Sequence, residues 1–552
     1  MPAVWILYRT KEGFMERRTL IALALSFLVL GFYPLVLQKF YPDYYKQNAA
    51  AHSKSQGVKS LAPAAGAPTF LKTGVFTPAE DVVFKSQKLG LVFNKKDGGI
   101  REIAFPAFVD SETKAPLKLL SLKDTGVSLG AVVILSGGDL TTVTDYQAMQ
   151  NASENSFIAT ALSGKIQVKK SVVFGPDYAG KLHLAFENLS DSPVEIQYEL
   201  LAGSGITPRH SIDNQYIEAN FFSQQADQKK LKHIKAPRIG KQVLSDGVVQ
   251  WAAIKDRHFS VILKPASQDS FTGVAHGLGN QDLSASLLSP KLVLPPHGGV
   301  AEDFTLYIGP NELEPLMASG LEELVNFGKF DLIGKFFVGA LELLHNIFRN
   351  YGVAIIVLTA LINLLLFPLT RVSYMSMKRM QLIQPQMSKL REQNKKNPEK
   401  LNKEMMELYR KHKVNPFGGC MPMVVQIPIF IALYVALSKS VILINSKLLW
   451  IKDLSSPDSV PLPFSLPVLG NSIHVLPLLM VGAMAAQQRF TQIKIEGKDP
   501  AMEQQQKMMA VMMPVVFGFI FYQMPSGLVL YWLTNTILMS AYQLKLKNMT
   551  LA

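Results

Sequence analysis

The sequence predicts an α+β membrane protein with six transmembrane helices, a large β-sandwich domain and a helical hairpin on the cytoplasmic side. Two apolar runs of near-bilayer length, 351–369 and 420–437, are the first observation. The second is the cation-rich arm that joins them, because such loops stay in the cytoplasm. The third is the region 76–310, where apolar and polar residues alternate as in half-buried strands.

The composition fits a chain with both membrane and soluble parts. Of 552 residues, 48% are hydrophobic and 18% are charged, and the mean hydropathy is +0.17. The net charge of +14 suits either nucleic acid or anionic lipid. Much of that charge flanks apolar runs and no nucleic-acid-binding motif is visible, so we expect anionic lipids as partners. The single cysteine, Cys420, excludes an internal disulfide, and neither a metal nor another cofactor is predicted.

The first 75 residues are predicted to hold a membrane anchor and a linker. Residues 1–18 form a basic cytoplasmic segment, in which Met15 is an alternative start. Residues 19–38 are apolar, and a cleaved signal peptide is the alternative to an anchor, although no small-residue cleavage site follows promptly. Residues 39–75 are rich in small and polar residues and form a solvated linker.

Residues 76–310 are predicted to form a β-sandwich with its own core. The segment 182–186 alternates apolar and polar residues, and Asp97-Gly98-Gly99 is typical of a hairpin turn. Scattered histidines leave a hydrolytic or sugar-binding site open, but no metal spacing, nucleophile elbow or paired-acid pattern is visible. We therefore favour a spacer or docking role for this domain.

Residues 311–350 are predicted to contain a linker and then an amphipathic helix over 330–350. Leu332, Phe336 and Phe337 fall on one side of this helix, while Lys335 and Glu342 lie mostly elsewhere. We expect this helix to lie in the interface on the outer side of the membrane that the chain spans. The alternative is a helix packed on the sandwich.

Residues 351–544 are predicted to form a core of five membrane-spanning helices. Besides the two runs above, the spans are 474–490, 508–522 and 528–544. Cations concentrate in alternate loops, which places both termini, the arm 371–419 and the tail 545–552 in the cytoplasm. The arm is predicted to be a helical hairpin, with Pro385 interrupting its first helix. No internal repeat is visible, which weakens the alternative of a polytopic transporter or channel.

Polar residues inside the apolar spans are the candidate binding residues, because they are costly in lipid unless they face protein or water. The predicted groove residues are Thr359, Asn363, Gln426, Tyr531, Trp532, Thr534 and Asn535. For each one, a helix–helix hydrogen bond is the alternative. As a set over several spans, they favour a hydrophilic groove, and no catalytic residue is predicted.

Methionines in the arm are a second candidate binding surface. Met380 and Met387 lie on either side of Pro385. Flexible thioethers suit a surface that accepts many apolar sequences, and filling a core is the alternative.

Two long motifs resemble those of the YidC/Oxa/Alb family of membrane protein insertases. Residues 414–434 read Val-Asn-Pro-Phe-Gly-Gly-Cys-Met-Pro-Met-Val-Val-Gln-Ile-Pro-Ile-Phe-Ile-Ala-Leu-Tyr, and residues 524–532 read Met-Pro-Ser-Gly-Leu-Val-Leu-Tyr-Trp. With the N-terminal anchor and the large domain after it, the resemblance to bacterial members covers nearly the whole chain.

The resemblance implies an insertase and chaperone of a Gram-negative inner membrane, and not an enzyme. It implies a periplasmic β-sandwich, a groove within five C-terminal helices that opens to the cytoplasm, and action alone or beside the Sec translocon. Nascent membrane proteins are then the substrates, and a ribosome or targeting factor is a further partner. Bacterial members usually carry an arginine where this chain has Asn363, so the attraction of an arginine for acidic substrate tails is not expected.

Overall fold

The computed structural model describes residues 81–547 except 111–112, 123–127, 137–138, 152–155, 226–227, 236–240, 268–269, 280–281, 326–330, 395–396, 413, 415–420, 467–469 and 492–499. The predicted anchor over 19–38, the linker over 39–75 and Cys420 lie outside these residues. The chain divides into units Met1–Gly66 and Ala67–Ala552, and every contact given below lies within the second unit.

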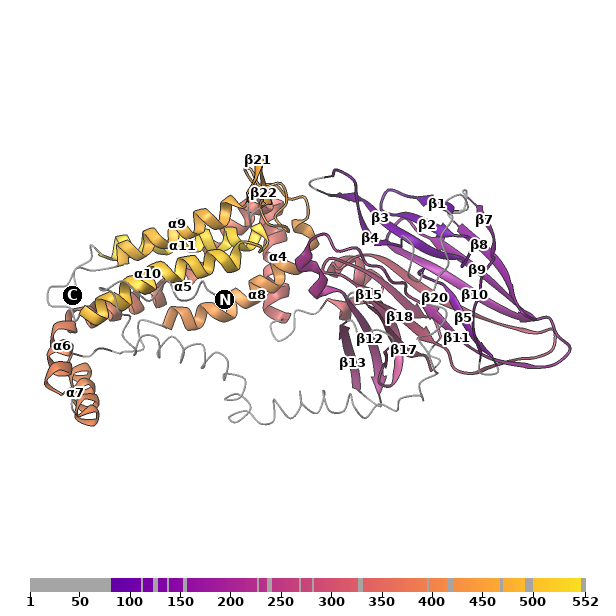
Figure 1. Ribbon diagram of the computed structural model, residues 1–552, viewed down its shortest axis with the longest axis horizontal. Helices are drawn as coiled ribbons and strands as arrows, with labels where there is room; N and C mark the ends of the chain where they lie inside the picture. The colour runs from indigo at the N-terminus through magenta and orange to yellow at the C-terminus, as the bar shows by residue number, and fades with distance from the viewer. Residues whose placement is uncertain are drawn as a thin grey trace, which may run out of the picture. The chain divides into compact units, whose positions relative to one another are not determined.

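Residues 81–310 form a β-rich domain of three antiparallel sheets (Figure 1). The largest has the order β13-β12-β15-β16-β20-β10-β9-β8-β7, the next β14-β17-β18-β11-β5-β6 with β19 beside β11, and the smallest β1-β2-β3-β4. The strands are β1 (Asp81–Lys85), β2 (Gly90–Asn94), β3 (Gly99–Val109), β4 (Pro116–Ser121), β5 (Val132–Ser136), β6 (Asp139–Thr142), β7 (Gln147–Asn151), β8 (Ser156–Ser163), β9 (Ile166–Phe174), β10 (Ala179–Asn188), β11 (Val194–Leu201), β12 (Glu218–Gln225), β13 (Gln228–Lys235), β14 (Gln242–Leu244), β15 (Val248–Lys255), β16 (Phe259–Pro265), β17 (Thr272–Gly279), β18 (Asp282–Leu288), β19 (Leu292–Leu294) and β20 (Gly299–Pro310).

The core of this domain follows from the alternating pattern, with one charged exception. Along β9, every second residue is buried, and the fifth position of the strand is Lys170. The Lys170 ammonium donates to the carbonyls of Asp97 at 3.0 Å and Gly130 at 2.8 Å, so the buried group is hydrogen-bonded. Burial lowers the pKa of Lys170 to about 7, against the opposing effect of the Asp97 charge.

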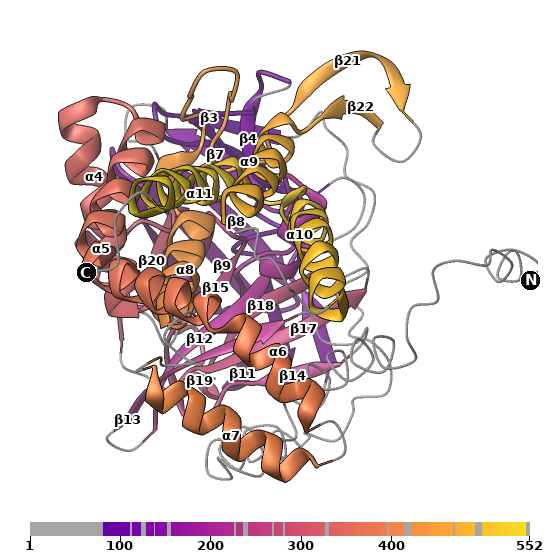
Figure 2. The same cartoon turned by 90° about the vertical axis from the view of Figure 1, so that its left-hand side faces the viewer.

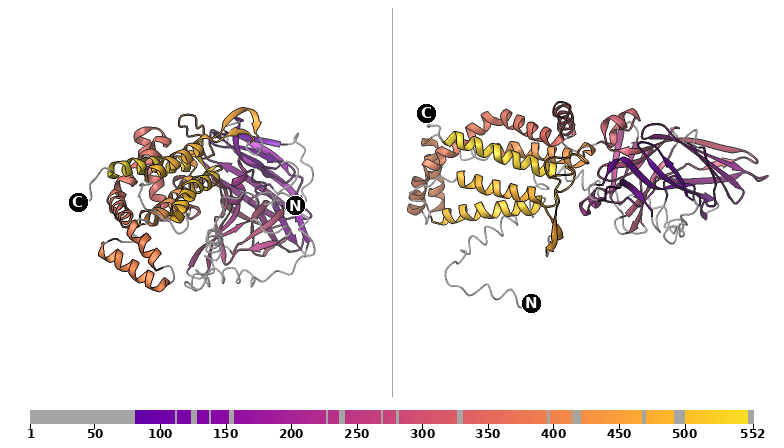
Figure 3. Two further views of the ribbon diagram at one scale, coloured as in Figure 1. Left: turned by 60° about the vertical axis from the view of Figure 1, so that its left-hand side comes forward. Right: turned by 90° about the horizontal axis from the view of Figure 1, so that it is seen from above.

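The rest of the described chain is mostly helical (Figures 1 and 3). The helices are α3 (Leu313–Ala318), α4 (Asp331–Phe348), α5 (Tyr351–Leu382), α6 (Gln384–Gln393), α7 (Pro398–Lys411), α8 (Met421–Lys439), α9 (Val475–Thr491), α10 (Pro500–Phe521) and α11 (Ser526–Lys547), with short 3-10 turns η4 (Ser211–Tyr216), η5 (Glu322–Leu324) and η7 (Val441–Leu443). A two-stranded hairpin, β21 (Val460–Leu466) and β22 (Gly470–Ile473), precedes α9. Helix α11 packs against α9 and α5, and α10 packs against α9.

Helix α4 has two apolar faces. Gly334, Phe337, Leu341 and Leu344 are buried, and the helix packs against α5 and α8. Its opposite face exposes further apolar residues, of which Leu332 is the most exposed at 83%. An apolar face left uncovered beside a membrane helix is suited to lipid.

Helix α5 is longer than the sequence pattern suggests. The apolar run ends near Leu369, but the helix continues through Pro368 to Leu382. Proline removes one backbone hydrogen bond, which is not enough to end a helix that neighbouring helices support. The helix ends before Ile383, and α6 begins with Pro385 in its first turn, a position that proline favours.

Among the described residues, α5 is the one helix long and apolar enough to cross a membrane by length and composition. Helices α8 and α10 contain the shorter apolar stretches Val425–Lys439 and Ala510–Phe521. The number of six spans therefore stays a prediction.

Candidate functional site

A polar ladder on α5 reaches across to α11. The Thr359 hydroxyl donates to the Ile355 carbonyl at 2.6 Å, and the Asn363 amide donates to the Thr359 carbonyl at 2.9 Å. The same Asn363 amide donates to the Asn535 side-chain oxygen at 2.9 Å. Thr359 and Asn363 are buried, and Asn535 is half-buried. The structure therefore brings Asn363 and Asn535 together from two helices, with Thr359 behind them.

A second polar pair joins α8 to α11. The Gln426 amide donates to the Tyr531 hydroxyl. Tyr531 is fully buried, whereas Gln426 is half-buried. Because Tyr531 and Asn535 lie one helical turn apart on α11, the two pairs fall along the same helix face.

Trp532 stands beside these pairs in an aromatic cluster. Its ring meets Phe430 of α8 edge-on at 4.9 Å and lies 5.3 Å from both Phe517 and Phe521 of α10. The ring remains half-buried, as does Thr534 two residues further along α11. Trp532 thus combines apolar packing with a partly exposed ring.

The predicted groove residues divide by exposure. Thr359, Asn363 and Tyr531 are buried, and their contacts are those of packed helices. The half-buried members, which keep surface for a further contact, are Gln426, Trp532, Thr534 and Asn535. None of these seven residues carries a formal charge, and we call them the neutral cluster.

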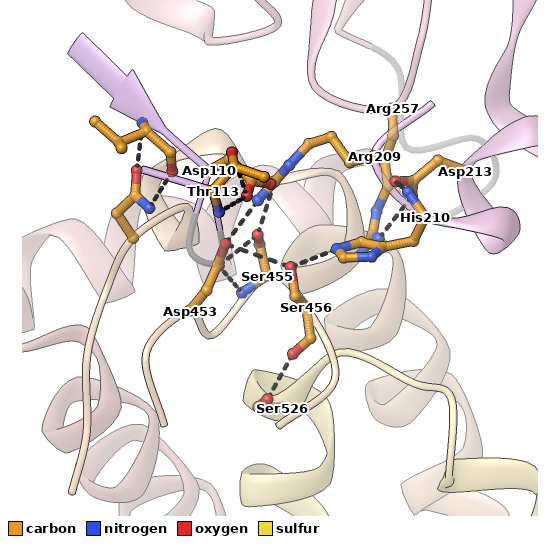
Figure 4. Close-up of polar contacts among 12 residues, drawn as sticks. Asp110, Thr113, Arg209, His210, Asp213, Arg257, Asp453, Ser455, Ser456 and Ser526 are labelled. Carbon is orange, nitrogen blue, oxygen red and sulfur yellow. Dashed lines mark hydrogen bonds and ion pairs between the residues drawn. The ribbon is translucent and has the colours of Figure 1, made fainter. Parts of the chain in front are cut away.

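A second buried polar cluster, which the sequence analysis did not identify, joins the β-rich domain to the loop after α8 (Figure 4). We call it the junction cluster. Arg209 forms an ion pair of 2.7 Å with Asp453, and Arg257 forms one of 3.2 Å with Asp213. All four side chains are at least nine-tenths buried. Arg257 also donates to the carbonyl of Ser438 near the end of α8.

The loop that receives Arg209 also holds the start of α11. The backbone N–H groups of Ser526 and Gly527 donate to the carbonyls of Ser456 and Leu454, at 2.8 and 2.9 Å. These bonds satisfy amide groups that a helix start leaves without an intrahelical partner. His210 Nε2 lies 2.9 Å from the Ser456 hydroxyl, and burial lowers the pKa of His210. The junction cluster thus connects the β-rich domain to two helices of the core.

The paired residues of the junction cluster lie far apart in the sequence. Arg209 and Asp453 are separated by 244 residues, and the loop around Asp453 is marked in the sequence only by its serines and prolines. Arg209 lies in the segment between β11 and η4, and Arg257 lies in the turn between β15 and β16, so neither is marked by the strand pattern.

Of the predicted arm residues, Met380 and Met387 belong to a small hairpin core, whereas Pro385 lies in the first turn of α6; Figure 2 shows the two helices of this hairpin, α6 and α7. Helices α6 and α7 pack on each other, and Met387 is 6% exposed in a core shared with Ile383, Leu408 and Val414. Met380 is partly buried against that core. The contacts of Met387 are therefore those of a core residue, which is the alternative weighed for these methionines.

Two family models match the chain and together span most of it. The model described as YidC periplasmic domain matches residues 81–340, and the model described as 60Kd inner membrane protein matches residues 343–551. The first coincides with the β-rich domain through α4, and the second begins within α4 and includes α5 to α11.

Relatives of similar length match almost end to end. A protein of Pelobacter propionicus named membrane protein insertase YidC is 32% identical over 97% of this chain and 99% of its own length. One of Geotalea uraniireducens with the same name is 33% identical over 96% and 98%. A crystal structure described as an active YidC insertase covers 86% of this chain and 96% of its own, at 18% identity and a TM-score of 0.37.

Proposed function

The chain belongs to the YidC family of membrane protein insertases, and from this premise we propose that it inserts newly made proteins into the inner membrane along the half-buried surface of Gln426, Trp532, Thr534 and Asn535. The observation that supports this most is the pair of neutral hydrogen bonds, Asn363 to Asn535 and Gln426 to Tyr531. They place hydrogen-bonding groups within the mostly apolar stretches of α5, α8 and α11.

The physical problem in insertion is solvation. A polar backbone group without a partner in hydrocarbon costs several kcal/mol, so an unassisted segment meets a high barrier. An intramolecular hydrogen bond between neutral groups contributes only about 0.5–1.5 kcal/mol net, so it is cheap to exchange. A substrate carbonyl can accept from Asn363 in place of Asn535, and a substrate N–H can donate to Tyr531 in place of Gln426, while the displaced Asn535 and Gln426 are half-buried and keep surface for another partner. The cluster therefore lowers the barrier without holding the substrate tightly.

The proposed topology has six spans, with both termini, the hairpin of α6 and α7 and the C-terminal tail in the cytoplasm. It rests on the alternation of cations between the apolar runs. The β-rich domain then lies in the periplasm, where the junction cluster holds it against the core. The basic residues of the arm are suited to anionic lipid, and a ribosome, a targeting factor and the Sec translocon are the further proposed partners.

A reconstituted insertion assay tests the proposal. Purified full-length chain in proteoliposomes should insert a short single-span substrate, measured by its protection from added protease. Combining Gln426→Leu with Asn535→Leu should reduce insertion several-fold, because the amide donor of Gln426 and the side-chain acceptor of Asn535 are both lost. The matched control is Ile537→Leu, an apolar exchange at an exposed position of α11. Equal insertion by the double variant and the control would reject the cluster as the substrate surface.

A further inference from the structure

An exposed apolar turn lies in the loop after α8, just before the junction residue Asp453. Leu448 and Ile451 pair in both directions, with N–H to carbonyl distances of 3.0 and 2.9 Å. The two residues between them, Leu449 and Trp450, form the tip of this turn. Leu449 is 84% exposed, and Trp450 is 38% exposed.

The residue types at the tip are unfavourable for a turn in water. Leu449 has a φ of 52°, in the left-handed region. Two-residue turns with positive φ at this place normally use glycine, asparagine or aspartate, because other side chains crowd the backbone there. Two large apolar side chains are therefore exposed side by side in a turn that glycine or small polar residues normally occupy.

Three helices begin at the level of this tip. The Asn350 amide, at the start of α5, donates to the Lys447 carbonyl at 3.0 Å, and Leu448 occupies the space over Gly352 where any side chain would clash. Asp458 accepts from the Trp450 indole at 3.2 Å and from the first turn of α9, at Leu476, at 2.8 Å. The start of α11 is held by the same loop, through Ser456. The tip therefore lies at one common end of the helix bundle.

We propose that Leu449 and Trp450 insert into the outer leaflet of the bilayer and fix the depth of this end of the core. The apolar helix α5 begins beside the tip, so the tip continues the membrane-facing surface at the depth of the head groups. Trp450 has its N–H satisfied and its ring exposed, as tryptophans do at membrane interfaces. Lys447 and Lys452 flank the tip and are exposed, which suits lipid phosphates.

This inference rests on the proposed topology, and depth measurements on the full-length chain in lipid nanodiscs separate the two. The single cysteine is removed by Cys420→Ser, and a spin label is placed at Leu449→Cys. Controls are Leu361→Cys, exposed near the middle of the apolar run 351–369 of α5, and Val293→Cys, exposed on β19. Accessibility to oxygen against a water-soluble nickel complex gives the depth of each label.

The spin label at 449 should be more accessible to oxygen than to the nickel complex, and the label at 361 should show the same preference more strongly. The label at 293 should be more accessible to the nickel complex. A label at 449 that matches 293 overturns the proposal. Nickel access at 361 as well would instead reject the membrane topology. A label at 449 exposed in nanodiscs but shielded in native membranes would assign the tip to a protein partner, which also overturns the proposal.

A second measurement avoids substitution at the strained residue. Tryptophan fluorescence of the otherwise native chain should be quenched by lipids brominated near the head groups, and Trp450→Phe should remove most of that quenching. Unchanged quenching in Trp450→Phe would show that the ring does not contact the lipid.

Discussion

The junction cluster and the neutral cluster of the helical core both join elements distant in sequence, yet the first is buried throughout, the second is partly exposed, and they are built from opposite chemistry. The junction cluster pairs full charges, Arg209 with Asp453 and Arg257 with Asp213. The neutral cluster pairs amides and a phenol, Asn363 with Asn535 and Gln426 with Tyr531. A buried charge without its partner is very costly, whereas a neutral group can change partners. The difference suits one region to rigid attachment and the other to exchange with a substrate.

The largest effect should follow from breaking a junction ion pair. Arg209→Met leaves the buried Asp453 without its cation, and we expect the free energy of unfolding to fall by about 3–5 kcal/mol. Thermal or denaturant unfolding of the detergent-solubilised chain measures this.

The matched control is Lys291→Met. Lys291 lies 2.7 Å from Glu195, but both side chains are more than half exposed, so the expected change is below about 1 kcal/mol. Similar losses of unfolding free energy in Arg209→Met and Lys291→Met would contradict a structural role for the junction cluster.

Lowering the pH should weaken the stabilisation that comes from charged pairs, but not the stabilisation that comes from neutral hydrogen bonds. Burial opposes the ionisation of Glu218, but hydrogen bonds and charges from His233 and Lys255 prevail and lower its pKa from 4.5 to about 2. Because the folded pKa lies below the unfolded one, the stabilisation is complete above pH 4.5 and is lost as the pH falls toward 2.

Glu218→Gln should therefore cost about 1–3 kcal/mol of unfolding free energy at pH 6 and clearly less at pH 3. The comparison of wild type and variant at both pH values measures it. A difference that is the same at both would mean that the Glu218 charge does not contribute.

The smallest effect should come from the neutral cluster. In a double-mutant cycle of Asn363→Leu and Asn535→Leu, we expect a coupling of about 0.5–1.5 kcal/mol, typical of polar pairs between membrane helices. Unfolding in detergent again gives the values. A coupling as large as the loss from Arg209→Met would remove the contrast on which the exchange model depends.

The sequence predicted the alternation of the strands well, but it placed Leu332, Phe336 and Phe337 on one side of the helix now seen as α4, where only Phe337 is buried, and it did not identify the partners of buried polar groups. Alternation over 182–186 marks the buried side of β10, but no local pattern shows that Lys170 on the neighbouring strand is buried and bonds to the carbonyls of Asp97 and Gly130. Thr359 and Asn363 share a helix face by their spacing, whereas the partner of Asn363 lies 172 residues away. Such contacts depend on tertiary packing, which a single sequence does not encode in its periodicity.

Helix ends were a second limit of the sequence analysis. Pro368 marks the end of the apolar run, yet α5 continues to Leu382. The loop after α8 is marked in the sequence only by its serines and prolines, although it receives Arg209 and bonds to the start of α11. Local composition identifies a loop, but not the buried bonds that give it a fixed structure.

Photo-crosslinking to a ribosome-bound nascent membrane protein tests the central proposal most directly. Probes at Gln426, Trp532 and Asn535, which are half-buried, should capture the nascent chain. Probes at the fully buried Thr359 and at the exposed apolar Leu361 should capture little or none. Capture at Leu361 equal to that at the three half-buried positions would contradict a substrate surface at the neutral cluster.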